Sequence, residues 1–131
     1  MARIKPDESI IGLEGPVYDV DLERGRIRQF AKSIYAFHPA YHEESKPVVP
    51  PTFLMMAGYF YGYILARAPR DSAFGSIDED FTTCADGGQE FVFHGPLPRA
   101  GDPLVASTHM HDFKERQGRR GGRLRIYVTC T

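Results

Sequence analysis

The segment from Thr52 to Arg67 places the tightest constraint on what this chain can fold into. Its residues, TFLMMAGYFYGYILAR, are apolar around nearly the whole circumference of a helix, and such a helix must be covered by protein or inserted in a membrane. The segment is shorter than the ~20 residues that a membrane span requires. Pro51 suits the first turn of a helix, and Pro69 ends it. The sequence therefore predicts a long, buried central helix.

The second half of the chain changes to the two-residue period of β-strands. Residues 90–94 alternate, residues 104–110 place apolar side chains on one side, and residues 123–130 alternate throughout. In the last strand we predict an inner side formed by Leu124, Ile126, Val128 and Cys130 and an outer side formed by Arg123, Arg125, Tyr127 and Thr129. Stretches rich in glycine and proline, at 95–103 and 117–122, supply the turns between strands.

The first half supplies one strand and one helix before the central segment. Residues 15–20 are predicted as a strand, and Asp21 is placed to cap a helix over Leu22–Ile34. In that helix one apolar stripe is predicted to be buried and the basic residues to face solvent. The stripe comprises Ile27, Phe30, Ala31 and Ile34, and the basic residues are Arg24, Arg28 and Lys32. The prolines within 35–51 predict an ordered loop or a lid.

An antiparallel sheet has a face that must be covered, and a helix that is apolar on every side is what a curved sheet can wrap. We therefore predict one α+β domain over residues 1–131 with the hotdog arrangement, an antiparallel sheet wrapped around a long central helix. The last strand ends at Thr131 without a hairpin partner. Its open edge predicts pairing with another chain, in a homodimer or a heterodimer.

The composition excludes several classes of protein. With 42% hydrophobic and 25% charged residues, the chain has the make-up of a globular domain. A net charge of −1 gives no global field for nucleic acid. Cys84 and Cys130 lack the spacing of a metal site, and the N-terminus lacks the apolar core of a signal peptide. We expect a cytoplasmic protein that uses no metal or redox cofactor.

Several stretches, in order, resemble the MaoC-like hydratase/dehydratase family. They are IIGLEGPVYDV, IRQFAKSIYAFHPAYHEE, VVPPTF and GGQEFVFHGPLPRAGDPL, and together they extend over nearly the whole chain. The similarity is to the amino-terminal type of domain, which includes accessory subunits of (R)-3-hydroxyacyl thioester dehydratases. It implies a hotdog fold and an acyl thioester substrate carried by coenzyme A or acyl carrier protein. The closing hairpin and last strand of the family are not found in the sequence up to Thr131.

The resemblance also implies which residues perform the chemistry. Active members carry an aspartate and, five residues later, a histidine on the loop after the first helix, and the pair adds water to an enoyl thioester or removes it. His42 matches the histidine and Pro39 a proline of this motif, but Phe37 occupies the aspartate position. We therefore expect an accessory or substrate-binding subunit of an (R)-specific enoyl-thioester hydratase or 3-hydroxyacyl-thioester dehydratase, paired with a chain that supplies Asp and His. The alternatives are a self-sufficient hydratase with His42 as acid/base and a non-enzymatic acyl-CoA or acyl-carrier binding module.

The other candidate residues each have a functional and a structural interpretation. Backbone amides at the start of the central helix, near Thr52, are expected to polarise the thioester carbonyl. His38 is expected to make a local hydrogen bond, and Glu43 and Glu44 to form a solvated pair. The residues expected to contact the substrate are Phe37, Tyr41, Thr52, Phe53, Met56 and Tyr59, with core packing as the alternative for the apolar ones on the central segment.

A basic run and two histidines complete the candidates. Arg119, Arg120 and Arg123 are expected to bind the phosphates of coenzyme A or an acidic carrier protein. A solvated hairpin is the alternative, and nucleic-acid binding is disfavoured because no stacking aromatic residues are interleaved. His109 and His111 share one side of a strand, but without a third ligand near them in sequence we predict no metal site.

Overall fold

The computed structural model describes residues 2–131. Its contacts divide the chain into two compact units. The first unit comprises Met1–Val17, Tyr63–Ala85 and Ala106–Thr131, and the second comprises Tyr18–Gly62 and Asp86–Val105. Among the helices of the described chain, none has the length and apolar character to cross a membrane.

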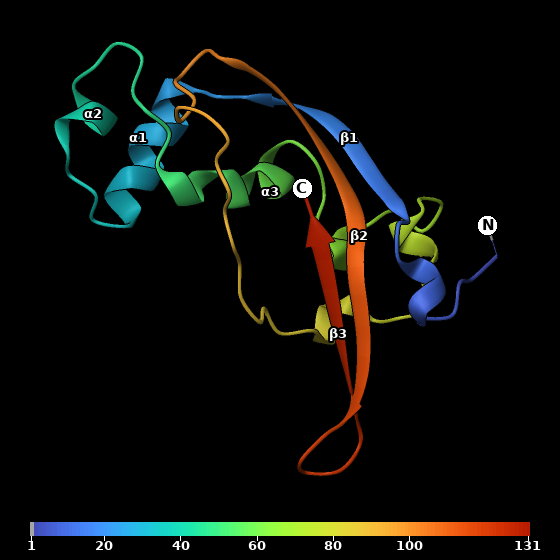
Figure 1. Cartoon of the computed structure of the whole chain (residues 1–131). Helices are drawn as coiled ribbons and strands as arrows, with labels where there is room; N and C mark the ends of the chain where they lie inside the picture. The colour runs from blue at the N-terminus through green and yellow to red at the C-terminus, as the bar shows by residue number, and fades with distance from the viewer. Residues whose placement is uncertain (1) are drawn as a thin grey trace. The chain divides into compact units, whose positions relative to one another are not determined.

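A three-stranded sheet lies mainly in the first unit, and its first two strands run partly within the residues of the second (Figure 1). Its strands are β1 (Glu14–Asp21), β2 (Pro103–Gln117) and β3 (Arg123–Cys130), in the order β1-β2-β3. β2 and β3 pair antiparallel, with Phe113 opposite Tyr127. The strands predicted over 15–20 and 123–130 are confirmed, and the strand predicted over 104–110 extends further than expected.

The core of the first unit packs on one face of β2. Its buried members are Ile10, Phe74, Ile77, Phe81, Met110 and Phe113. The segment before β1 is held beside β2 by two backbone hydrogen bonds: Gly12 N–H donates to the carbonyl of Met110 at 2.7 Å, and Met110 N–H donates to the carbonyl of Leu13 at 2.9 Å. Pairing of this kind satisfies the backbone groups that burial would otherwise leave without partners.

The buried face of β3 is the reverse of the predicted one. The ring of Tyr127 lies edge-on to Phe81, with 5.0 Å between centroids, and 5.2 Å from Phe113. The residues predicted to point inward are exposed instead: Leu124 by 52%, Ile126 by 37%, Val128 by 39%, and Cys130 as well. A two-residue period determines which side chains share a face, but not which face is covered. In this structure Phe81 and Phe113 cover the face of β3 that carries Tyr127.

In the second unit the helix α1 (Arg24–Ser33) confirms the helix predicted over Leu22–Ile34. Ile27 and Ala31 are buried, as predicted for the apolar stripe, but Phe30 is half-buried and Ile34, at the end of the helix, is 46% exposed, which corrects that part of the prediction. Phe30 extends this packing to the central segment, because its ring meets that of Phe53 edge-on at 5.4 Å between centroids. Such aromatic contacts stabilise a core by more than their buried area alone.

Two details of α1 differ from expectation. Its N-cap is Glu23 rather than Asp21, and the cap side chain makes no hydrogen bond to the helix. Arg28 is half-buried rather than solvated, because its guanidinium donates from Nη2 to the carbonyl of Glu44 at 3.0 Å. This contact ties the helix to the loop that follows it.

The structure corrects the predicted long helix over residues 52–67. The segment forms a 3₁₀ helix at Pro51–Met56, the short helix α3 (Ala57–Phe60) and a 3₁₀ turn at Leu65–Arg67. Gly58 and Gly62 each disfavour a helix by about 1 kcal/mol relative to alanine. Gly62 also lies against Tyr18, where a Cβ atom would come within 2.4 Å of the ring. A close approach of two segments therefore replaces further helical turns, and part of the apolar surface stays exposed, as at Tyr59 (55%).

The strand predicted over residues 90–94 is also corrected, since these residues are irregular. They follow Gly88, whose φ of 145° interrupts an extended run. Val92 is 66% exposed and Phe93 38% exposed, so the alternation reflects no covered face. Five alternating residues are a weak signal when no neighbouring strand accepts their hydrogen bonds.

Replacing glycine by alanine is expected to have opposite effects on stability at two positions. A Cβ atom at Gly75 would lie 1.8 Å from the backbone oxygen of Pro69, whereas a Cβ atom at Gly25, within α1, meets nothing within 4 Å. We expect Gly75→Ala to lower the free energy of unfolding by about 2–3 kcal/mol through overpacking. Gly25→Ala should raise it by about 0.5–1 kcal/mol. Urea denaturation followed by circular dichroism measures both, and equal effects of the two variants would contradict the prediction.

Candidate functional site

The loop after α1 begins with a residue in an unusual conformation. Tyr35 has a φ of 58°, in the left-handed region that favours glycine. The backbone N–H of Tyr35 donates to the carbonyl of Lys32 at 3.1 Å, and that of Ala36 donates to the carbonyl of Ala31 at 2.9 Å. These two bonds form the Schellman pattern that ends many helices. A non-glycine residue in this conformation costs about 1–2 kcal/mol.

A short helix, α2 (Pro39–His42), closes the loop. His38 caps it, because its Nδ1 accepts a hydrogen bond from the backbone N–H of Ala40 at 3.2 Å. The local hydrogen bond predicted for His38 is thereby confirmed.

His42 is half-buried, and its imidazole is held from two sides. Its Nε2 lies 2.8 Å from the carbonyl oxygen of Ala36. Because a carbonyl only accepts, Nε2 carries a proton. The ring of Phe37 stacks on the imidazole, with 6.2 Å between centroids and 27° between planes. Phe37 itself is 65% exposed.

The carboxylates nearest to His42 in the sequence do not bind its imidazole. Glu44 forms a surface ion pair with Arg99, and its carbonyl accepts from Arg28, but its side chain stays 49% exposed, in keeping with the predicted solvated pair. Glu43 is exposed. Among the hydrogen bonds and ion pairs of residues 2–131, none joins a carboxylate to the imidazole of His42.

The residues predicted to contact a substrate all lie in the second unit. Thr52 and Tyr59 are exposed, Tyr41 and Met56 are half-buried, and Phe53 is fully buried against Phe30. The amide of Phe53 already donates to the carbonyl of Pro50 at 2.9 Å. The amides predicted to polarise a carbonyl therefore begin a short 3₁₀ helix, whose dipole is smaller than that of a long α-helix.

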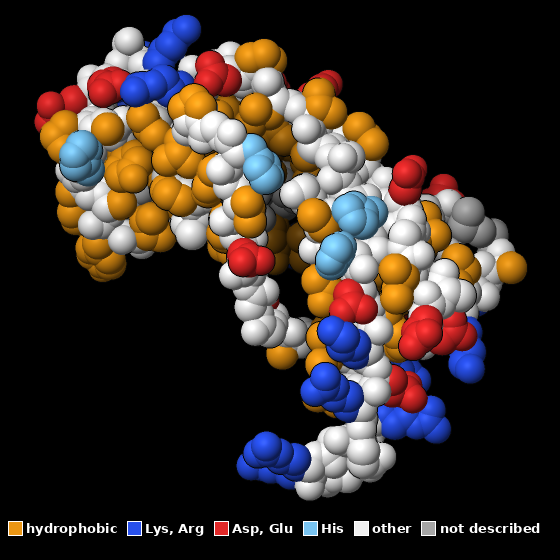
Figure 2. All heavy atoms as spheres, in the orientation of Figure 1, with side chains coloured by type: hydrophobic (Ala, Val, Ile, Leu, Met, Phe, Trp, Pro, Cys, Tyr) orange, Lys and Arg blue, Asp and Glu red, His pale blue; other side chains and the backbone are white. Residues whose placement is uncertain are grey.

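The predicted phosphate-binding arginines lie in the first unit, on the hairpin that joins β2 to β3. Arg119 and Arg120 are exposed at its tip, and Arg123 lies 3.7 Å from a carboxylate oxygen of Glu115. Figure 2 shows Lys and Arg side chains gathered along the hairpin and at its end. Residues 112–125 hold six basic and two acidic side chains, so this hairpin carries +4 in a chain of net charge −1. The rest of the chain is accordingly acidic.

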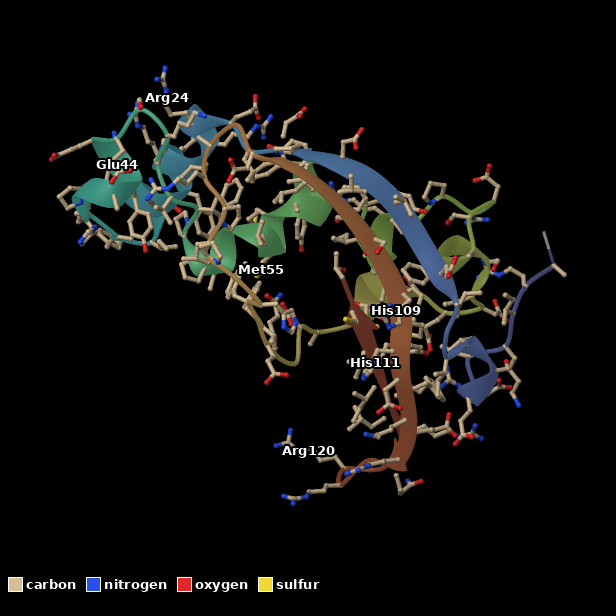
Figure 3. All side chains as sticks on the ribbon, turned by 45° about the horizontal axis from the view of Figure 1, so that its top comes forward. Arg24, Glu44, Met55, His109, His111 and Arg120 are labelled. Atoms are coloured by element: carbon tan, nitrogen blue, oxygen red, sulfur yellow. The ribbon has the colours of Figure 1, made fainter. Side chains whose placement is uncertain are left out.

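His109 and His111 lie near each other on β2 (Figure 3), with 5.9 Å between ring centroids. Within residues 2–131, no three or more His, Cys, Asp or Glu side chains gather closely enough to hold a metal ion.

Comparison with known proteins places the chain in a family. A family model described as the FAS1-like, dehydratase domain region matches residues 9–131. The chain belongs to this family. It is thus a FAS1-like dehydratase domain of the MaoC-like hotdog type, as the resemblance in the sequence predicted.

Two individual proteins are similar to this FAS1-like dehydratase domain. A UPF0336 protein of Streptomyces griseus is 28% identical over 123 residues, which cover 86% of this chain and 76% of that protein. The crystal structure of the C-terminally truncated HadBC (3R-hydroxyacyl-ACP dehydratase) complex from Mycobacterium tuberculosis matches with a TM-score of 0.52 and 22% identity, over 92% of this chain and 97% of that one. The similarity to the HadBC structure shows that this chain has the hotdog fold.

One cluster in this dehydratase domain was not predicted from the sequence. The carboxylate of Glu79 accepts hydrogen bonds from the hydroxyl of Tyr127 at 2.6 Å and from Nη1 of Arg125 at 2.7 Å. The Tyr127 bond, followed by the Arg125 bond, holds the pKa of Glu79 below its usual value, while burial opposes them. Burial and the same hydrogen bond raise the pKa of Tyr127. The two-residue spacing of Arg125 and Tyr127, which places both on one face of β3, is the sequence feature that could have indicated this cluster.

We expect Tyr127→Phe to lower the free energy of unfolding by about 1 kcal/mol at pH 7, because Glu79 loses a charge-assisted hydrogen bond while the ring still packs. The folded pKa of Glu79 lies below its ordinary value of 4.5. Its stabilisation is therefore complete above that value and is lost as the pH falls through the folded pKa. Unfolding free energies measured from pH 7 to pH 3 should converge for the two proteins. A difference that grows on acidification would contradict this origin.

Proposed function

We propose that this chain is an accessory, acyl-thioester-binding subunit of an (R)-specific enoyl-thioester hydratase or 3-hydroxyacyl-thioester dehydratase. One observation carries the proposal: where active MaoC-like members have an aspartate, Phe37 presents a ring that stacks on His42. A phenyl ring can neither deprotonate water nor orient it. The carboxylate that hydration requires must therefore come from a second chain.

The reaction adds the hydroxyl of water to the β carbon of an enoyl thioester and a proton to the α carbon, or reverses both steps. A carboxylate takes the proton from water, and an imidazole exchanges the second proton. In this chain the half-buried His42 donates its Nε2 proton to Ala36, which positions the ring as a support for Phe37. The matched solved structure is that of a HadBC (3R-hydroxyacyl-ACP dehydratase) complex, and this supports an assembly with a second hotdog subunit.

Substrate contact is assigned to the exposed and half-buried residues of the second unit. Phe37, Tyr41, Met56 and Tyr59 offer apolar surface to an acyl chain, and Thr52 lies at the start of the 3₁₀ helix. The cations of Arg119, Arg120 and Arg123 suit the phosphates of coenzyme A or of a carrier protein. No cofactor is required for the reaction proposed.

Two alternative functions make different predictions from this proposal. A self-sufficient hydratase would use the imidazole of His42 as acid and base, and the fixed, half-buried position of this ring is the one observation in its favour. A non-enzymatic binding module would hold the thioester without turnover in any mixture. Hydration by this chain alone would favour the self-sufficient hydratase over the proposal. Turnover that appears only after a partner is added would exclude the non-enzymatic binding module.

The binding part of the proposal is tested with butyryl-CoA, a saturated thioester that cannot be hydrated. We expect calorimetry to show binding of butyryl-CoA that is at least several-fold tighter than that of free coenzyme A, because the acyl chain adds apolar contact area. The matched variant Tyr59→Ser should narrow this ratio, whereas Val92→Ser, which replaces an exposed apolar residue elsewhere in the same unit, should not. Equal affinity for the two ligands would remove the acyl-binding role.

A further inference from the structure

The hairpin arginines that lie on β3 are paired with carboxylates of the same unit. Arg123 lies 3.7 Å from Glu115, while Arg125 lies 3.1 Å from Glu115 and 2.7 Å from Glu79. A groove of about 500 Å³ opens beside these pairs, and both arginines line it. An anion that entered this groove would compete with these carboxylates for the guanidinium groups. In the groove, the hairpin therefore presents paired arginines rather than free cations.

The arginines at the end of the same hairpin lack such pairing. Arg116, Arg119 and Arg120 are exposed, and none of the ion pairs among residues 2–131 includes them. We call these three residues the arginine tip, and Figure 3 shows Arg120 at the far end of the hairpin. Residues 116–123, RQGRRGGR, contain no acidic side chain. The tip thus carries positive charge that no carboxylate of the described chain neutralises.

The turn between the two strands holds the arginine tip in a defined shape. The N–H of Gly118 donates to the carbonyl of Gly122 at 3.0 Å, and the N–H of Gly121 donates to the carbonyl of Gly118 at 3.2 Å. Gly121 and Gly122 have φ values of 87° and 76°, which glycine adopts without strain. Because these amides bond within the turn, they are not available to cradle a phosphate. Arg119 and Arg120 therefore project from a preformed corner, which lowers the entropic cost of binding.

We propose that the arginine tip is the docking surface for the acidic face of an acyl carrier protein. The inference rests on the proposed function, in which either coenzyme A or a carrier protein carries the thioester, and it chooses the second. A nucleotide is bound best in a concave site with convergent donors, whereas the free cations of the tip lie exposed at the end of a projecting hairpin (Figure 1). Exposed cations of this kind attract a protein surface of opposite charge before contact is made.

Two other anionic surfaces fit the arginine tip less well. Proteins bind single-stranded nucleic acid through cations combined with stacking aromatic rings, and residues 114–126 contain no Phe, Tyr or Trp. A segment that lies on an anionic membrane adds apolar side chains that enter the lipid, and residues 116–123 contain no apolar side chain. These two absences favour a protein partner.

The experiment uses the apo form of an acyl carrier protein from the same organism, which lacks the phosphopantetheine arm and so bears neither its phosphate nor an acyl group. We expect the double variant Arg119→Gln, Arg120→Gln to weaken binding of this protein by about 3- to 20-fold at about 0.05 M salt, because two exposed ion pairs are lost. The difference should narrow at about 0.5 M salt, where such pairs are screened. Affinity for butyryl-CoA should stay unchanged.

The matched control is the double variant Arg24→Gln, Lys32→Gln, which removes the same charge from exposed positions of α1 in the other unit. It should leave carrier affinity unchanged. An equal loss of carrier affinity in both double variants would show a dependence on net charge alone and overturn the docking surface. A loss of butyryl-CoA affinity equal to that for the carrier would assign the tip to nucleotide phosphates. Tip-dependent binding of poly(U) RNA, with no binding of the carrier, would assign it to nucleic acid.

The outcomes separate this inference from the proposed function. Carrier affinity that is unchanged in the tip variant, with turnover still restored by an Asp/His-bearing subunit, overturns the docking surface and leaves the accessory role intact. Tip-dependent carrier binding, in a mixture with that subunit that hydrates no enoyl thioester, overturns the accessory role and leaves the docking surface intact.

Discussion

The purified chain is expected to hydrate crotonyl-CoA about 10² to 10⁴ times more slowly than the same chain mixed with an Asp/His-bearing MaoC-like subunit. This range is what a positioned general acid/base contributes. Phe37 supplies no proton acceptor, and neither Glu43 nor Glu44, which is paired with Arg99, is hydrogen-bonded to the imidazole of His42. His42 alone can exchange a proton at the α carbon but cannot hold and deprotonate the attacking water. Loss of the enoyl ultraviolet absorbance measures the rate.

The control for this result is the partner measured by itself over the same concentrations. Turnover that rises with the concentration of this chain and saturates at a fixed ratio would show that the two proteins act as one assembly. Robust hydration by this chain alone, abolished by His42→Ala, would show that another group replaces the aspartate. The accessory role would then be wrong.

The elements that the sequence predicted well are those fixed by local chemistry. The helix over Leu22–Ile34 has a continuous apolar stripe, and its buried Ile27 and Ala31 are confirmed. The strand over 123–130 has strict alternation and is found at those bounds. His38 makes the predicted local bond because its ring reaches an amide two residues away. None of these features depends on distant neighbours.

The elements that the sequence predicted poorly depend on what lies across the fold. The apolar segment at 52–67 does not form one helix, since Gly62 accommodates Tyr18 from a different part of the chain. The inner face of β3 is decided by Phe81, Phe113 and Glu79, none of which its alternation can reveal. Tertiary contacts of this kind override both periodicity and propensity.

The candidate loop also has some features that the sequence predicts and others that it does not. Its position after α1 and the place of Phe37 five residues before His42 follow from the sequence. The protonated Nε2 of His42 and the left-handed Tyr35 do not, because each depends on a particular carbonyl group and its orientation.

In the mixed enzyme, His42→Ala in this chain is expected to change the hydration rate by no more than about twofold, while replacement of the partner's motif aspartate by asparagine removes about 10² to 10⁴. The reason is that His42 directs its proton to Ala36 and its face to Phe37, so it supports the loop rather than the reacting carbons. Steady-state rates at saturating partner measure both effects, and the Tm of His42→Ala controls for folding. A loss of tenfold or more in His42→Ala, with unchanged Tm and unchanged partner affinity, would mean that this imidazole takes part in proton transfer.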